Sequence, residues 1–325
     1  MRAFDFAAAN HVNQAIRLAT VDSAYLAGGT TLVDLMKLDV LTPRQVIDIN
    51  ALNLRGIRLD QSGLRLGAME RMADVAADAD VGAEYPVIVQ ALLLSASGQV
   101  RNMASIGGNL LQRTRCGYFR DVTTPCNKRA PGSGCPARTG ENRSHAILGT
   151  SPACVATHAS DLAVALVALD ARIRLRGRDG ERVVDLAEFY RLPGTTPHVE
   201  NDLRPGELIT EVLVPRLPWA RRSSYVKIRD RSSFEFALTS AAVAMDLRGS
   251  TVHNVRIAVG GVGTRPWRLP AVEAALRGRP ATERDFTEAA ALAAEGAQPL
   301  AHNGFKVTLV QRTIVRALLG LAGAR

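Results

Sequence analysis

The sequence predicts an α+β protein in three lobes, and three observations lead to this fold class. Short β-type segments alternate with helical segments over the first 55 residues. Strands and helices then mix from about residue 56 to residue 218. Beyond a boundary marked by Pro215, Pro218 and a pair of arginines, three β-type segments precede three helical segments. Runs of strands followed by runs of helices are typical of α+β proteins.

The first lobe is expected to form a small α/β unit. Three short strands are expected at Arg2–Phe6, Ala24–Ala27 and Gln45–Ile49. Val12–Ala19 has apolar residues at helical spacing, and so does Leu32–Leu38, directly after two glycines and two threonines. In this lobe the chain therefore passes from a strand through a glycine-rich turn into a helix.

The second lobe is expected to combine a hairpin, several helices and a long irregular segment. Two apolar segments flank a Gln-Ser-Gly turn and predict the hairpin. Ser160 is the expected N-cap of an amphipathic helix that ends near Asp170. Residues 113–150 show little periodicity, and a loop of that length needs something else to order it. The other elements expected here are helices at 71–77 and 87–96 and strands at 57–59, 64–66, 173–176 and 208–214.

The third lobe is expected to be a three-stranded antiparallel meander followed by a helical bundle. Its strands are predicted at 224–228, 237–247 and 255–260. Its helices are predicted at 270–276, 283–294 and about 305–319.

Composition and charge exclude several classes of protein. Of the 325 residues, 47% are hydrophobic and 22% are charged, which is close to the globular average and excludes a disordered or fibrous chain. The net charge of +9 invites a nucleic-acid partner, but aromatic residues make up only 5% and the basic residues form no single stripe. A nucleic-acid partner is therefore not expected. No apolar run is long enough to span a membrane, so a membrane span is not expected either.

Two glycine pairs are candidates for binding a dinucleotide. They lie in the segments LAGGTTL, residues 26–32, and SIGGNL, residues 105–110. Glycines let the backbone approach a ligand closely, and a helix N-terminus suits a pyrophosphate. Either segment alone could be a simple capped turn, but two such turns favour a shared phosphate site. Asp161 could accept a hydrogen bond from a ribose hydroxyl, or it could be a first-turn acid that interacts favourably with the helix dipole. Tyr190 could lie beside a flavin as a gate, or it could be a partly buried aromatic residue.

All the cysteines lie within 39 residues. They are Cys116, Cys126, Cys135 and Cys154. Their spacing is not the tandem CxxC of a zinc ribbon or bacterial ferredoxin, so disulfides, a zinc site and a [4Fe-4S] cluster all stay open. Nearby cations favour a site of net negative charge, which disfavours disulfides but does not separate the two metal sites. Those cations are Arg113, Arg115, Arg120, Lys128 and Arg129.

Four segments in this order resemble the flavoprotein subunit of the xanthine dehydrogenase and molybdenum hydroxylase family. They are AGGTTL, SIGGNL, the Ser-Asp-Leu segment at 160–162 and the Gly-Glu-Leu-Ile segment at 206–209. The stretches NLLQRTRC, PCNKR, PGSGC and KIRDR are more narrowly similar to the FAD-binding subunits of periplasmic aldehyde oxidoreductases. The resemblance implies a two-lobed FAD-binding domain and a C-terminal domain like that of the carbon monoxide dehydrogenase flavoprotein. The expected bounds are 1–218 for the first domain, with lobes 1–55 and 56–218 and an iron-sulfur insertion at about 113–155, and 222–325 for the second.

The resemblance also implies that FAD binds between the first two lobes. Residues 27–32 would surround its pyrophosphate through backbone N–H groups, and the turn at 107–109 would hold the other side of the dinucleotide. Asp161 would bind a ribitol or ribose hydroxyl. Lys227 would lie near the polar edge of the flavin, although it could also be a surface lysine. The residues implied for FAD are Leu26, Ala27, Gly28, Gly29, Thr30, Thr31, Leu32, Ser105, Gly107, Gly108, Asn109, Asp161, Lys227, and Leu208 and Ile209, which would pack on the flavin or adenine.

The narrower resemblance implies a [4Fe-4S] cluster held by the four cysteines and an electron-transfer subunit without a catalytic residue of its own. Electrons would pass from the [2Fe-2S] clusters of a partner to FAD and then to an external acceptor. The implied partners are a molybdenum-cofactor large subunit and a [2Fe-2S] small subunit in a heterotrimer. The chain shows no signal peptide, so we expect it to be periplasmic by co-export with a signal-bearing partner, or cytoplasmic.

Other functions stay open at this point. The chain could be the flavoprotein subunit of another molybdenum hydroxylase, acting on xanthine, an aromatic thioester or an N-heterocycle. It could also be a stand-alone FAD oxidoreductase or a zinc-stapled binding protein. The flavin and metal content of the purified protein would separate these classes.

Overall fold

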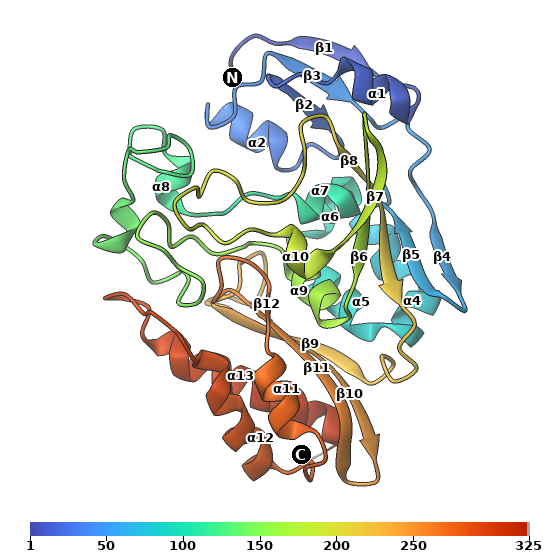
Figure 1. Cartoon of the computed structure of the whole chain (residues 1–325), viewed down its shortest axis with the longest axis vertical. Coiled ribbons are helices and arrows are strands. Elements are labelled where there is room, and N and C mark those ends of the chain that lie inside the picture. Colours follow the sequence, from blue (N-terminus) through green and yellow to red (C-terminus); the bar gives the residue numbers. More distant parts are fainter. Residues whose placement is uncertain (324–325) are drawn as a thin grey trace.

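Three β-sheets form the frame of the molecule, and helices pack around and between them (Figure 1). The computed structural model describes residues 1–323. The α+β fold class is as the sequence predicts. The first lobe lies at the top of the view, the third at the bottom and the second between them. Among the described residues, no helix is both long and apolar enough to cross a membrane.

The first lobe is a parallel sheet in the order β1-β3-β2. Its strands are β1 (Asp5–Ala8), β2 (Ser23–Leu26) and β3 (Gln45–Asp48). Parallel neighbours need crossover connections, which α1 (Val12–Leu18) and α2 (Leu32–Lys37) supply. Strand β1 begins later than expected because its pairing with β3 starts at Asp5.

The second lobe is a five-stranded antiparallel sheet in the order β4-β5-β8-β6-β7, covered by short helices. The strands are β4 (Ile57–Asp60), β5 (Gly63–Gly67), β6 (Arg172–Gly177), β7 (Gly180–Asp185) and β8 (Leu208–Pro215). The helices are α3 (Met72–Ala77), α4 (Ala79–Glu84), α5 (Pro86–Leu93), α6 (Gly98–Met103), α7 (Ile106–Leu110), α9 (Asp161–Ala168) and α10 (Leu186–Phe189). Strand β7 and helices α4, α6, α7 and α10 were not expected, because their short segments have too few apolar residues to show a clear hydrophobic period.

The expectation that α9 is amphipathic is wrong. Ser160 does cap this helix by accepting the Ala163 N–H at 2.9 Å. All eight residues of α9 are buried, however, since the helix packs against α5 on one side and the sheet of the third lobe on another. Helix α9 is therefore a central element that joins the second and third lobes.

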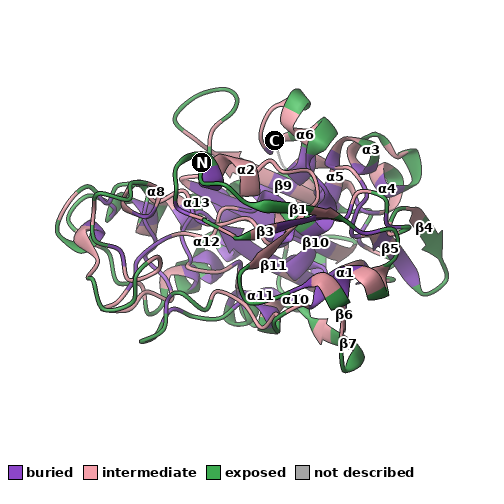
Figure 2. Cartoon of the chain, turned by 90° about the horizontal axis from the view of Figure 1, so that it is seen from above, coloured by how far each residue is buried: buried purple, intermediate pink, exposed green. Residues whose placement is uncertain are grey.

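The third lobe is an antiparallel sheet backed by three helices. Its order is β12-β11-β10-β9, so a short fourth strand, β12, extends the expected meander. The strands are β9 (Ser223–Ile228), β10 (Thr239–Arg248), β11 (Thr251–Gly260) and β12 (Trp267–Arg268). The helices are α11 (Pro270–Leu276), α12 (Glu283–Ala290), which continues as a 3-10 turn to Ala294, and α13 (Phe305–Ala322). Figure 2 shows buried residues concentrated along β9, β10 and β11 at the centre of the molecule.

The irregular segment at 113–158 forms a loop-rich projection with one helical turn, α8 (Gly117–Arg120), and a 3-10 turn at Pro136–Arg138 (Figure 1). Backbone bonds attach it to the third lobe, because the N–H groups of Ile147 and Leu148 both donate to the Val262 carbonyl, at 2.8 and 3.0 Å. The Lys306 ammonium, fully buried on α13, donates to the carbonyls of Ser144 and His145 at 2.9 and 3.0 Å. These anchors hold the segment against the sheet.

Candidate functional site

Two neighbouring cavities form a cleft where the three lobes meet. The larger, cavity A, has a volume of about 410 Å³, which is within the usual range of ligand pockets. Thr30 and Thr31 of the first lobe, Gly108 and Asn109 of the second and Lys227 of the third are among its lining residues. The smaller, cavity B, has a volume of about 210 Å³. The residues that line both cavities are Arg115, Ala159, Asp161, Glu235 and Phe236.

The first glycine turn is pressed against the end of helix α6. A Cβ atom on Gly28 would lie 2.0 Å from the Met103 carbonyl oxygen, so a larger residue cannot occupy this position without a shift of backbone. Gly29 has a φ of +70°, in the left-handed region that favours glycine. The Asn50 amide donates to the Ala27 carbonyl at 2.9 Å and fixes the turn. The turn thereby presents Thr30 and Thr31 to cavity A.

The second glycine turn opens helix α7. The Ser105 hydroxyl accepts the Gly108 N–H at 3.2 Å, so Ser105 supports the turn and does not line cavity A. A Cβ atom on Gly107 would lie 3.0 Å from the Cβ of Ala68 on the neighbouring backbone. Asn109 accepts a hydrogen bond of 2.6 Å from the Ser160 hydroxyl. This bond ties the turn to the start of α9, where Asp161 lies.

Asp161 and Lys227 form a buried ion pair in the wall of cavity A. The Lys227 ammonium donates to Asp161 Oδ2 at 2.8 Å, and the lysine side chain is only 1% exposed. The alternative that Lys227 is a surface lysine is therefore wrong. Tyr225 and Ser95 also donate to the Asp161 carboxylate, at 2.7 and 3.1 Å. Burial, together with the Asp161 charge, raises the pKa of Tyr225 well above its ordinary value, so this hydroxyl stays a donor.

The structure divides the residues assigned to FAD into lining and supporting groups. The cavity wall contains Thr30, Thr31, Gly108, Asn109, Asp161 and Lys227. Leu208 and Ile209 do not line either cavity, and they pack in the hydrophobic cores of the first and second lobes. The other residues frame the turns and likewise lie outside the lining of cavities A and B; they are Leu26, Ala27, Gly28, Gly29, Leu32, Ser105 and Gly107. Their roles toward FAD stay predictions.

Sequence reasoning missed a charged group that closes cavity A on the side of the first lobe. Asp34 on α2 accepts hydrogen bonds from Arg120 at 2.7 and 3.0 Å and from Arg115 at 3.0 Å. The Arg120 hydrogen bond is the main reason that the pKa of Asp34 lies below its usual value. All three residues line cavity A. The sequence did single out the two arginines, but as cations near the cysteines and not as partners of a carboxylate in the first lobe.

The loop between β9 and β10 carries exposed aromatic residues and lies beside the cleft. Phe234 and Phe236 are 56% and 44% exposed, and both line cavity A. Phe234 has a φ of +51°, which is rare for a bulky residue. The Arg115 guanidinium lies 5.2 Å from the ring centroid of Phe236, so the loop rests on the cysteine segment. Exposed aromatics in an irregular loop have no periodic signal, so sequence patterns could not find them.

The four cysteines converge on one small gap of about 10 Å³ in the 113–158 segment. All four are free, so the alternative of two disulfides is not seen among them. Among residues 1–323, no three His, Cys, Asp or Glu side chains are grouped to hold one metal ion. Burial raises the pKa of Cys116 to about 11, and it raises that of Cys154. Without a bound cation, these buried sulfurs therefore favour the protonated form.

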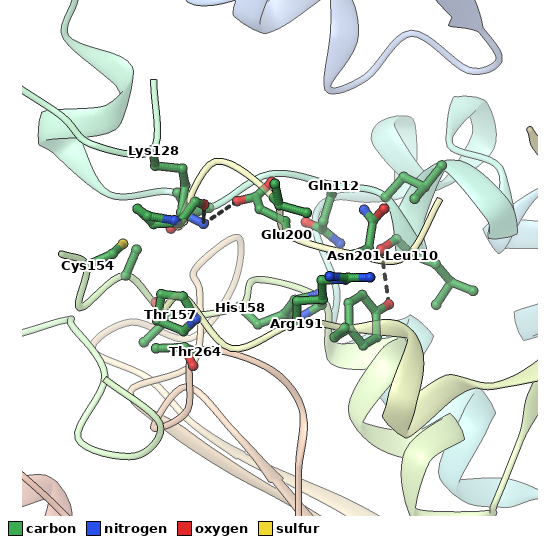
Figure 3. A pocket seen from close by; sticks show the side chains of 17 residues that line it. Leu110, Gln112, Lys128, Cys154, Thr157, His158, Arg191, Glu200, Asn201 and Thr264 are labelled. Carbon is green, nitrogen blue, oxygen red and sulfur yellow. Dashed lines mark hydrogen bonds and ion pairs between the residues drawn. The ribbon is translucent and has the colours of Figure 1, made fainter. Parts of the chain in front are cut away.

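Most cations near the cysteines pair with carboxylates. Arg115 and Arg120 bind Asp34, as described above. Lys128 bonds Glu200 at 2.6 Å, as Figure 3 shows, and Arg113 pairs with the same carboxylate. The Lys128 charge still acts on Cys154, where it opposes the effect of burial on the thiol pKa. The cations that were expected to balance a negatively charged cysteine site are therefore mostly balanced by carboxylates in this structure.

Tyr190 lines neither cavity A nor cavity B. It lines a further cavity of about 30 Å³ together with Lys128, Cys154 and His158, and Figure 3 labels the last three. Its hydroxyl donates to the Leu110 carbonyl at 3.0 Å, and its ring packs edge-on against His158 at 4.5 Å. Tyr190 is thus a buried aromatic between the second lobe and the cysteine segment, and it does not line the cleft.

Comparisons with known proteins show the family to which the chain belongs. Residues 2–217 match the family described as the FAD binding domain in molybdopterin dehydrogenase. Residues 224–321 match the CO dehydrogenase flavoprotein C-terminal domain. The chain is 45% identical to the aldehyde oxidoreductase FAD-binding subunit PaoB of Escherichia coli, over 98% of each chain. It is 31% identical to the glyceraldehyde dehydrogenase medium chain of Sulfolobus acidocaldarius, over 78% of this chain and 73% of that one.

A solved structure shows the same fold. The carbon monoxide dehydrogenase of Hydrogenophaga pseudoflava, in a form that lacks the Mo-pyranopterin moiety, contains a chain that matches with a TM-score of 0.76 and 28% identity. The match covers 99% of this chain and 98% of that one. Both family regions and the full-length relative therefore agree, and the chain belongs to the family of FAD-binding medium subunits of the molybdopterin dehydrogenases.

Proposed function

We propose that this chain is the FAD-binding and electron-transferring subunit of a molybdenum-containing aldehyde oxidoreductase, and that its four cysteines hold a [4Fe-4S] cluster. One observation carries the flavin part: cavity A joins both glycine turns to the buried Asp161–Lys227 pair. The identity of 45% over nearly the whole chain to an aldehyde oxidoreductase FAD-binding subunit supports the substrate class. Electrons would come from [2Fe-2S] clusters of a partner and leave to an external acceptor.

The cleft has features that suit FAD. FAD, when bound, supplies the capacity to accept and release electrons. Gly28 packs directly against the Met103 carbonyl, and the backbone N–H groups of residues 28–31 in this first turn can approach a pyrophosphate. In the second turn the N–H groups of Gly107, Gly108 and Asn109 already donate to Ala68 and Ser105, so this turn would contact the dinucleotide through its close-packed backbone and the Asn109 side chain. The Lys227–Asp161 ion pair lies in the cavity wall and offers hydrogen-bonding groups to the polar parts of a bound FAD.

The [4Fe-4S] assignment has its own support. Four free sulfurs line one gap. Four thiolates can bind either a zinc ion or a [4Fe-4S] cluster, so the donor set suits both. The narrower resemblance to aldehyde oxidoreductase FAD-binding subunits, at 45% identity, favours the cluster.

The proposed partners are a molybdenum-cofactor large subunit and a [2Fe-2S] small subunit. Support comes from the family, described as the FAD binding domain in molybdopterin dehydrogenase, and from the structural relative, a carbon monoxide dehydrogenase in a form that lacks the Mo-pyranopterin moiety of its molybdenum cofactor. For the compartment we propose the periplasm, by co-export with a signal-bearing partner, with the cytoplasm as the alternative. A fractionation of the native host with an antibody to this chain would decide between them.

A tagged pull-down with cofactor analysis tests the proposal. The chain should come with two further subunits and contain FAD, iron and acid-labile sulfide, with molybdenum in the large partner. The complex should reduce an artificial acceptor when given an aldehyde. Isolation of a single yellow chain would favour a stand-alone flavoprotein, and turnover of an N-heterocycle but no aldehyde would favour another hydroxylase. A colourless chain with zinc would contradict both cofactor assignments.

A further inference from the structure

His145 lies at the boundary between the cysteine site and the cleft. It is 5% exposed, and it lines cavity B together with Cys116 and Asp161. Its Nε2 atom lies 3.2 Å from the Cys116 sulfur. Its Nδ1 atom is buried and has no hydrogen-bond partner among the described residues. Leaving a buried polar atom without a hydrogen bond costs free energy, which indicates that a bound group supplies the partner of Nδ1.

The position of this histidine is tightly fixed. Its backbone N–H donates to the Asn142 carbonyl at 2.9 Å. Its carbonyl accepts hydrogen bonds from the Lys306 ammonium at 3.0 Å and from the Asn303 amide at 3.3 Å. Helix α13 of the third lobe supplies Lys306, and the segment before it supplies Asn303. Three hydrogen bonds therefore fix the backbone of His145, whose ring contacts the Cys116 sulfur.

We propose that His145 links the two cofactor sites, by donating Nε2–H to the Cys116 sulfur and accepting a hydrogen bond at Nδ1 from the flavin bound in the cleft where cavities A and B meet. This inference rests on the proposed function. A sulfur bound to iron has no proton of its own, so it only accepts, and the histidine must donate to it. In the neutral ring, Nδ1 is then the acceptor, which suits a flavin N–H group. Hydrogen bonds to cluster sulfurs raise the reduction potential.

Two substitutions separate the two hydrogen bonds. The amide of His145→Gln reaches the position of Nε2 and keeps the donor to the sulfur, while it loses the acceptor at Nδ1. The shorter amide of His145→Asn keeps an acceptor near Nδ1 and loses the donor. His158→Asn is the control, because His158 also lines cavity B but has no bond to a cysteine among the described residues.

The experiment measures iron and FAD content, the cluster midpoint potential by EPR-monitored redox titration, and FAD affinity, all on the purified full-length chain. His145→Asn should shift the cluster potential to a more negative value and leave FAD affinity near wild type. His145→Gln should do the reverse, with FAD bound about fivefold more weakly, as expected for one hydrogen bond. His158→Asn should leave the cluster potential unchanged.

Different outcomes overturn different claims. A wild-type chain with FAD and iron whose potential is unchanged in His145→Asn contradicts the sulfur bond and leaves the proposed function intact. Equal effects of both His145 variants on both readouts would reduce the residue to a packing role and overturn the inference. A wild-type chain without iron overturns the cluster assignment and this inference together.

Discussion

Replacing Gly28 with alanine should weaken FAD binding, because the first glycine turn is pressed against helix α6. The added Cβ would lie 2.0 Å from the Met103 carbonyl oxygen, and ordinary contacts begin at 3.4 Å. The carbonyl and the turn must therefore move apart by about 1.4 Å, on the difference of those two distances. Gly28 does not have a positive φ, so the effect is steric and does not come from backbone strain.

The magnitude follows from the cost of overpacking. Forcing backbone apart in a well-packed region costs about 1–3 kcal/mol. In the flavin-free variant we expect the turn to move away from α6, which removes the clash. FAD binding requires the turn in its wild-type position, so the free energy of the clash is subtracted from the free energy of binding. The binding constant should then fall by about 5- to 150-fold. The same region includes Ala104, which lines cavity A directly after α6.

The assay is a fluorescence titration of FAD into deflavinated protein, with the melting temperature of the flavin-free chain measured in parallel. Gly82→Ala is the matched control, because Gly82 lies in helix α4 and an added Cβ meets nothing within 4 Å. That variant should bind FAD normally and gain up to about 1 kcal/mol of stability from helix propensity. The reasoning fails if Gly28→Ala binds FAD as tightly as wild type with an unchanged melting temperature.

Three further predictions concern the buried charges and the sulfurs. Lys227→Met leaves the Asp161 carboxylate buried without its cation, and it should lower the free energy of unfolding by about 3–5 kcal/mol in urea titrations, with much of the loss recovered in the Lys227→Met/Asp161→Asn double variant. Cys126→Ser should abolish bound iron and sensitise residues 113–158 to limited proteolysis, whereas persistence of full iron content would contradict its role as a ligand. Burial lowers the pKa of His158 to about 4 from an unfolded value near 6.5, so the unfolded chain binds the proton first, and stability should fall by about 2 kcal/mol between pH 7 and pH 5. Thermal melts across that range should show a shallower pH dependence in His158→Gln.

The hydrophobic periods predicted the elements that have long, one-sided apolar patterns. Helix α11 was predicted with both its ends, since a proline starts it and its apolar residues face one sheet. Helix α9 was located correctly, but its environment was not, because burial on all sides depends on packing between lobes. Helices α6 and α7 were missed although α2, of similar length, was predicted, since the segments GQVRNM and IGGNL have too few apolar residues to show a helical period.

The candidate site was predictable where chemistry follows the local sequence, and not where it depends on distant pairing. The two glycine turns and Asp161 were found from segments of a few residues. The pairing of Asp161 with Lys227 joins positions 66 residues apart, and no local pattern encodes it. Arg115 was noticed for its neighbour Cys116, yet its contacts are Asp34 and Phe236, from two other lobes. Leu208 and Ile209 show the opposite case, since their apolar segment fits a ligand wall and a hydrophobic core equally well.

The most direct test of the central claim is an experimental structure of the chain with FAD bound. The pyrophosphate should lie between residues 28–31 and 107–109, and the flavin ring should lie in the cleft beside Asp161 and Lys227. The same map should show a metal cluster bonded to all four cysteine sulfurs. FAD bound outside cavities A and B, or four unbound sulfurs in a protein purified without oxygen, would contradict the account.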